Sequence, residues 1–213
     1  MKKYFSFTID FKLLFPLIIT FVLFTIIGTV SHETGHYIAA KIVGLDAIVH
    51  YGSTSIIIPD DFDGIITKSE LFLVTLGGPL QTIFTGTLGL LLLLYNRKKN
   101  ISLKKLKIIH WFYIFLSLFW LRQTFNFITL ITKYFIKGRY SKQMDEIKLA
   151  RNLDIHDFSI LIPTAFIGLL VAFYIIFKYI PYNQRFTFIV SGLIGGILGF
   201  YFWLILFGKF ILP

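Results

Sequence analysis

The residues best suited to chemistry are two histidines and a glutamate, His32, Glu33 and His36, which form the pattern H-E-x-x-H. On an α-helix the two histidines are one turn apart and share a face. Imidazoles placed in this way can hold one Zn²⁺ at roughly 2.0–2.1 Å each, and the neighbouring glutamate can take a proton from water. The pattern therefore predicts a zinc site with Glu33 as its general base.

Two histidines do not complete such a site, because a catalytic zinc usually has three protein ligands and one open position. The chain contains no cysteine, so the third ligand must be a histidine, an aspartate or a glutamate. The candidates are the acidic and histidine residues of two polar connections, namely Asp145, Glu146, Asp154, His156, Asp157 and the acids of residues 60–63. Residue type alone leaves this choice open.

The composition places this pattern in a membrane protein. Of the 213 residues, 56% are hydrophobic and only 15% are charged, with a mean hydropathy of +0.76. A soluble domain of this length carries more charge. Several apolar runs reach the roughly 20 residues that cross a bilayer core. The expected fold class is an all-α polytopic membrane protein, forming a single domain over residues 1–213.

Five membrane spans are expected, and a short β-hairpin-like segment follows the first. The spans lie at about residues 13–30, 71–95, 108–135, 158–179 and 186–207. The first is predicted to be retained rather than cleaved as a signal peptide, because no small-x-small cleavage site follows it. We expect its helix to continue through Ile42 and to end at Gly44.

The segment after Gly44 is different in kind, because two β-prone stretches, 47–51 and 54–58, flank Gly52 and Ser53. This pattern is typical of a hairpin. A strand pair beside an active site can bind an extended peptide by adding it to an exposed edge. A simple extramembrane loop is the alternative interpretation, and the sequence favours neither.

The net charge of +10 fits basic loops beside membrane spans, and no nucleic-acid-binding motif is present. Six basic residues crowd the loop after the second span, at Arg97, Lys98, Lys99, Lys104, Lys105 and Lys107. Such a loop is expected on the cytoplasmic side, which would place the two histidines toward the outer face. The connection after the third span is also basic but carries acids as well.

Polar residues in the third span, Arg122, Gln123 and Asn126, are expected to face the bundle interior, because exposure to lipid is costly. Asn126 or Gln123 can stabilise the oxyanion of a hydrolytic reaction. Hydrogen bonding between helices is the alternative role for both amides. His110, at the start of this span, is expected to be interfacial.

The segment from His32 to Ala40 resembles the active-site helix of the site-2 protease family, the intramembrane zinc metalloproteases. Gly77-Gly78-Pro79-Leu80, near the start of the second span, is similar to a glycine-containing motif of that family. The stretch Asp145–Ala150 resembles the acidic third-ligand region of its compact bacterial members. The likeness covers the first, second and fourth spans in matching order.

This resemblance implies a zinc-dependent endopeptidase that hydrolyses membrane-anchored protein or peptide substrates within the bilayer of a bacterial cell membrane. The implied metal ligands are His32, His36 and Asp145, with Glu33 as the catalytic base. Better-known members carry an Asn-Pro-rich stretch ending in Leu-Asp-Gly, whereas here Asp154 lacks a preceding proline and is followed by Ile155. Asp154 therefore stays as the alternative third ligand, and motif resemblance favours Asp145.

Two other functions compete with proteolysis. A catalytically silent relative would hold zinc as a scaffold, but Glu33 is not needed merely to bind the metal. A transporter is the second alternative, although no charged relay runs through several spans. The sequence leaves the substrate and the oligomeric state undetermined.

Overall fold

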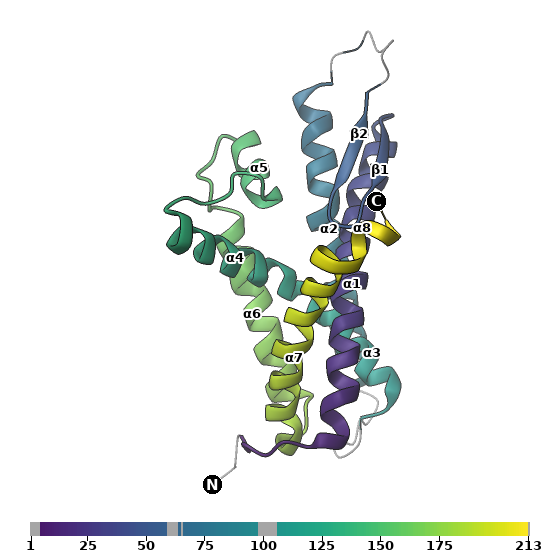
Figure 1. The fold of residues 1–213 in the computed structure, drawn as a ribbon, viewed down its shortest axis with the longest axis vertical. Helices are drawn as coiled ribbons and strands as arrows, with labels where there is room; N and C mark the ends of the chain where they lie inside the picture. The colour runs from purple at the N-terminus through teal and green to yellow at the C-terminus, as the bar shows by residue number, and fades with distance from the viewer. Residues whose placement is uncertain (1–4, 59–63, 65, 98–105, 213) are drawn as a thin grey trace.

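The computed structural model shows a bundle of helices with one small hairpin (Figure 1). The structure describes residues 5–58, 64, 66–97 and 106–212. The candidate acidic ligands of residues 60–63 and most of the basic loop, residues 98–105, lie outside the described residues. Five helical segments among the described residues are long and apolar enough to cross a membrane, so the predicted fold class is confirmed.

Helix α1, Phe11–Ile42, carries the H-E-x-x-H pattern in its second half, as the sequence predicts. Its start is capped by Asp10, whose side chain accepts a hydrogen bond from the Lys12 backbone N–H at 3.0 Å. Its end is marked by Gly44, which has a φ of +79°, and by a hydrogen bond from Leu45 N–H to Ala40 O at 2.9 Å. This closing pattern needs a left-handed residue, which explains the glycine.

The predicted hairpin is present and lies beside the second half of α1. Its strands, β1 (Asp46–Val49) and β2 (Thr54–Ile57), pair antiparallel, with Val49 opposite Thr54. The C-terminal segment fixes its turn, because the Trp203 indole donates to Tyr51 O at 2.6 Å and Tyr51 N–H donates to Leu212 O at 2.9 Å. The hairpin is therefore held between α1 and the end of the chain.

Helix α2, Lys68–Arg97, packs against α1 through two facing glycines. A Cβ atom added to Gly35 would lie 2.5 Å from Gly77 O and 2.7 Å from Gln81 Cβ. Side chains at either glycine would force the helices apart, so small residues set this close approach.

The predicted third span is present as Ile108–Lys137, and a short 3₁₀ turn interrupts its α-helix. Helix α3, Ile108–Ser117, passes through a 3₁₀ turn, Leu118–Trp120, into α4, Leu121–Lys137. Trp120 occupies this turn, and its indole donates to Thr87 Oγ1 on α2 at 3.3 Å. In Figure 1, α4 runs across the long axis of the molecule and not along it. The bend carries the polar residues of α4 toward α5.

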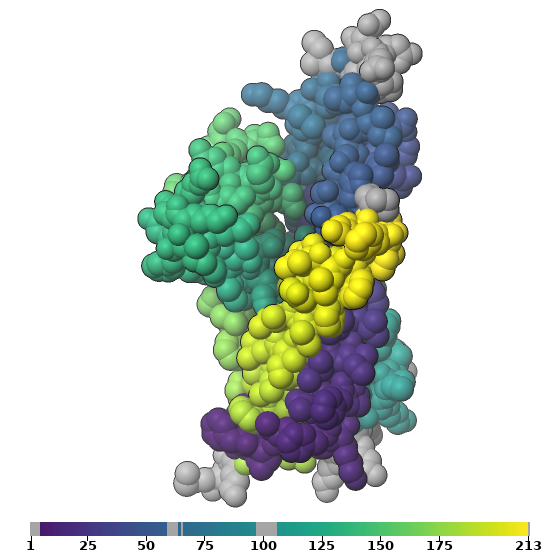
Figure 2. All heavy atoms as spheres, viewed as in Figure 1, coloured from purple at the N-terminus to yellow at the C-terminus, as the bar shows by residue number. Residues whose placement is uncertain are grey.

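The last elements are α5 (Asp145–Asn152), α6 (Leu161–Lys178) and α7 (Arg185–Phe200). A π-helical stretch, Tyr201–Phe207, and α8, Gly208–Ile211, continue the fifth span. Helix α7 packs along α1 and α6 packs against α4, while α5 lies against α2. Figure 2 shows a hollow between the lobe formed by α4 and α5 and the body formed by α1, α2 and the C-terminal segment.

The glycine contact between α1 and α2 yields a first prediction. Gly77→Ala should lower the free energy of unfolding by about 1–3 kcal/mol, because the added methyl group meets the Gly35 backbone. Gly196→Ala is the matched control, since its Cβ would meet no atom closer than Phe125 Cζ at 3.9 Å. Unfolding in mixed detergent micelles measures both, and equal stability of the two variants would contradict the packing role of Gly77.

Candidate metal centre

Three potential ligand atoms from α1 and α5 converge inside the molecule. His32 Nε2 lies 3.0 Å from Asp145 Oδ2, His36 Nε2 lies 3.3 Å from the same oxygen, and the two Nε2 atoms are 3.2 Å apart. A tetrahedral Zn²⁺ with bonds near 2.0–2.1 Å separates its ligand atoms by roughly 3.3–3.4 Å. The three edges of this triangle are therefore close to those that one tetrahedral ion requires.

The hydrogen bonds of the two imidazoles orient their lone pairs toward the triangle. His36 Nδ1 lies 2.7 Å from Val74 O, a carbonyl that can only accept, and farther from the Gly78 N–H, at 3.4 Å. His32 Nδ1 lies 2.9 Å from Thr82 Oγ1, whose own proton is donated to Gly78 O at 3.1 Å. Both Nδ1 atoms therefore carry a proton, and in the neutral rings both Nε2 atoms present a lone pair.

This arrangement fits a cation. Two nitrogen lone pairs and one carboxylate oxygen meet at about 3 Å with no proton between them in these tautomers. A proton shared along one edge would satisfy only that edge, whereas a divalent ion at the centre satisfies all three. Among the described residues, His32, His36 and Asp145 are the group whose atoms can jointly hold a metal ion.

A glycine makes room for this triangle. A Cβ atom on Gly78 of α2 would lie 2.6 Å from His32 Nε2 and closer still to His36 Nε2. Only hydrogen fits at this position while the histidines keep their orientation. The sequence motif around Gly77 and Gly78 thus has two separate roles, one in helix packing and one in leaving space at the site.

Asp145 reaches the histidines because it begins α5, a short helix with one buried face. Ile147 and Ala150 on that face are fully buried. Burial alone raises the pKa of Asp145, but hydrogen bonds and charge interactions with the two histidines outweigh it and hold this pKa below its ordinary value. Asp145 is therefore a carboxylate at neutral pH, which is the state that binds a metal.

A surface cluster holds the connection that carries α5. Arg151 Nε and Nη2 donate to Asp157 at 2.7 and 2.5 Å, and Tyr140 Oη donates to the same carboxylate at 2.8 Å. The hydrogen bonds from Arg151, followed by the one from Tyr140, lower the pKa of Asp157 to about 2. Asp157 stays ionised at neutral pH, so the cluster persists there.

Glu33 lies beside the triangle and is 5% exposed. Its carboxylate accepts a hydrogen bond from Thr54 Oγ1 at 3.1 Å, and the same hydroxyl approaches Glu33 O at 2.9 Å. Arg122 Nη2 of α4 lies 4.0 Å from Glu33 Oε1. The sequence marked Thr54 only as part of a strand, and no signal in it pointed to this contact.

The other candidate ligands lie elsewhere. Asp154 and His156 are exposed, and Asp157 pairs with Arg151. Glu146 is only 1% exposed, and its carboxylate accepts a hydrogen bond from Asn126 Nδ2 at 3.2 Å. Burial raises the pKa of Glu146 above its ordinary value. The acids of residues 60–63 lie outside the described residues.

The comparisons with known proteins add no relative. No family model matches the chain, and neither the curated proteins nor the solved structures give a match.

The triangle predicts which carboxylate binds metal. After loading with Zn²⁺ in detergent, the wild type should hold about one ion per chain. Asp145→Ala should lose most of this zinc because one of three ligands is removed, and Asp154→Ala should keep it. Elemental analysis after gel filtration measures both, and the reverse ranking would show that Asp154 is the ligand.

The space around the histidines gives a further prediction. Gly78→Ala should reduce zinc content as strongly as Asp145→Ala, because its methyl group would displace both imidazoles. Gly196→Ala serves again as the control and should bind zinc like the wild type. Full zinc occupancy in folded Gly78→Ala would be incompatible with the geometry described here.

Proposed function

We propose that this chain is a zinc-dependent intramembrane endopeptidase that cleaves membrane-anchored protein or peptide substrates. The observation that supports it best is the convergence of His32 Nε2, His36 Nε2 and Asp145 Oδ2 beside the Glu33 carboxylate. The resemblance of these segments to the site-2 protease family, in its compact bacterial form, supports the same function and a bacterial cell membrane as its place.

His32, His36 and Asp145 would hold the metal. The Nδ1 hydrogen bonds of the two histidines keep their rings in the binding orientation. Zn²⁺ bound there would supply a Lewis acid that polarises a carbonyl and acidifies water. Glu33 is not needed to hold the ion, so its position beside the ligands is best explained by proton transfer. It takes a proton from the attacking water and delivers it to the leaving amine.

Thr54 supports this role of Glu33. Its hydroxyl donates toward both Glu33 O and Glu33 Oε2, so a residue of β2 helps to fix the rotamer of the base. The hairpin contacts Glu33 through Thr54, and an extended substrate segment could add to the hairpin edge as a further strand. We therefore assign substrate alignment to the hairpin as part of the proposed function.

The location of the centre favours a substrate that is itself in the membrane. The histidines belong to a 32-residue helix whose apolar part can cross a bilayer, and they are almost completely buried. A soluble protein would need to unfold and enter the lipid to reach them. A membrane-anchored chain can approach laterally.

Replacement of Glu33 separates an enzyme from a metal-binding scaffold. Glu33→Gln should retain about one zinc per chain but lose at least about 100-fold in peptide cleavage, because the general base is removed. Glu70→Gln is the matched control, because Glu70 caps the start of α2 and bonds Thr67. Cleavage of internally quenched fluorescent peptides with one apolar segment, in the same micelles, gives the rates. Equal rates in Glu33→Gln and the wild type would end the protease proposal.

A further inference from the structure

We infer that Arg122, on α4, is the residue that binds the oxyanion of the reacting substrate carbonyl. The assignment rests on the proposed peptidase function and extends it to a specific residue. It also differs from the expectation that Asn126 or Gln123 fills this role.

The guanidinium of Arg122 has unused hydrogen-bonding capacity close to the site. Its Nη2 atom lies 4.0 Å from Glu33 Oε1, which is longer than the 2.7–2.9 Å typical of a charge-assisted hydrogen bond. Its Nε atom is buried without a hydrogen-bond partner among the described residues. Arginine carries five N–H donors, so most of them remain available for an anionic oxygen.

The side-chain amides of Asn126 and Gln123 are not free to bind the oxyanion, because the first is already hydrogen-bonded and the second is fully buried. Asn126 Nδ2 donates to both oxygens of Glu146, at 3.2 and 3.4 Å. Gln123 has no exposed surface, so a substrate cannot reach its amide without moving α4. Arg122, whose side chain is 22% exposed, is the polar residue of α4 that both adjoins Glu33 and is accessible.

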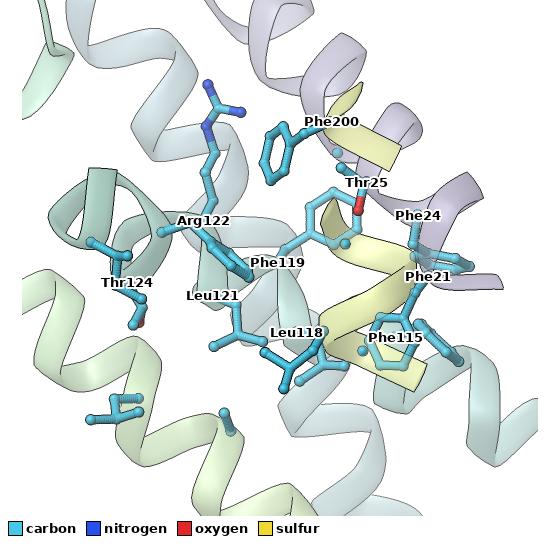
Figure 3. A pocket seen from close by; sticks show the side chains of 18 of the residues that line it. Phe21, Phe24, Thr25, Phe115, Leu118, Phe119, Leu121, Arg122, Thr124 and Phe200 are labelled. Atoms are coloured by element: carbon cyan, nitrogen blue, oxygen red, sulfur yellow. The ribbon is translucent and has the colours of Figure 1, made fainter. Parts of the chain in front are cut away.

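A cavity leads from the apolar part of the bundle to Arg122. It has a volume of about 320 Å³ and lies between α1, α4, α6 and α7. Figure 3 shows aromatic and aliphatic side chains around it, with the Arg122 side chain extending away from Leu118 and Leu121 at one end. Thr82, which bonds His32, and Thr29, one turn before Glu33, also line it.

The cavity could hold an apolar segment of the substrate and bring the reacting carbonyl of the same chain to Arg122. Apolar side chains of the substrate would fill the aromatic end, where burial is favourable. The peptide carbonyl would then lie at the polar end, between Arg122 and the ligand triangle. A positive group held there before the reaction needs no reorganisation when charge develops on the oxygen.

The water oxygen forms a bond to the carbonyl carbon, the π pair of C=O moves to its oxygen, and one water proton passes to Glu33. Arg122 donates N–H hydrogen bonds to that oxygen and transfers no proton. The pair then re-forms C=O, the C–N bond breaks, and the proton from Glu33 goes to the leaving nitrogen.

Variants of Arg122 test the assignment on the zinc-loaded protein with the internally quenched apolar peptides. Arg122→Gln should lower kcat by about 100-fold or more with unchanged zinc content, as loss of an oxyanion donor does. Arg122→Lys should retain more activity than Arg122→Gln because it keeps the charge. Arg139→Gln, on the exposed connection, removes one charge in the same way and should match the wild type.

A binding measurement without turnover keeps the test decisive. The measurement compares zinc-loaded Glu33→Gln with the double variant that also carries Arg122→Lys. The second substitution should weaken binding of a phosphoramidate peptide, whose anionic oxygen stands in for the oxyanion. It should leave binding of the uncharged amide peptide unchanged. Equal loss for both peptides, or no loss for either, would overturn the assignment.

The outcomes separate the two levels of the proposal. Wild-type kcat in Arg122→Gln overturns the role of Arg122 and leaves the peptidase function intact. Failure of the wild type to cleave any peptide overturns the peptidase function and, with it, the role of Arg122. If Arg122→Gln does not fold, the phosphoramidate binding of the lysine variant decides.

Discussion

The central constraint in this structure is the electrostatic cost of bringing three electron-rich ligand atoms together inside a membrane helix bundle. Two imidazole nitrogens and one carboxylate oxygen meet at 3.0–3.3 Å, and the side chains that carry them are largely buried. In a low-dielectric interior these atoms repel one another unless a proton or a metal ion lies between them. The hydrogen bonds that the two Nδ1 atoms donate to Val74 O and Thr82 Oγ1 hold the rings in this orientation, in which the Nε2 atoms can bind a cation.

The packing of α1 on α2 follows from the same constraint. The triangle needs both histidine rings on one face of α1 and needs α2 close enough to supply Val74 and Thr82 as partners. Glycines at 35 and 77 permit this approach, and Gly78 leaves the volume in which the rings and an ion can fit. Helix association in a membrane depends on such close backbone contact. The adjacent glycines 77 and 78 therefore serve both the packing of α2 on α1 and the space around the histidine rings.

Local sequence pattern determined much of this arrangement. The apolar runs, the H-E-x-x-H spacing, Gly44 and the turn at Gly52-Ser53 each act within a few residues, and the five spans, the end of α1 and the hairpin were predictable from them. Asp145 could be ranked above Asp154 only by resemblance, because the approach of α5 to α1 joins residues 113 positions apart. The bend at Leu118–Trp120 and the contact of Thr54 with Glu33 depend on tertiary packing, which leaves no local signal.

The bend in the third span explains why the candidate site draws on so many elements. A straight helix from Ile108 to Lys137 would carry Arg122 and Asn126 along the bundle axis. Helix α4 instead turns aside, so that Arg122 lies toward Glu33 and Asn126 toward α5. Asn126 then holds Glu146, the residue next to Asp145, while Arg122 adjoins Glu33. The hairpin contacts Glu33 through Thr54 of β2. Glu33 is thus approached by β2 and by α4, and each element is held in place by a contact away from Glu33. The C-terminal segment holds the hairpin that contains β2, and Trp120, just before α4, is hydrogen-bonded to α2. Rigid support of this kind fixes a charged side chain in an apolar setting, where no solvent would otherwise select its orientation.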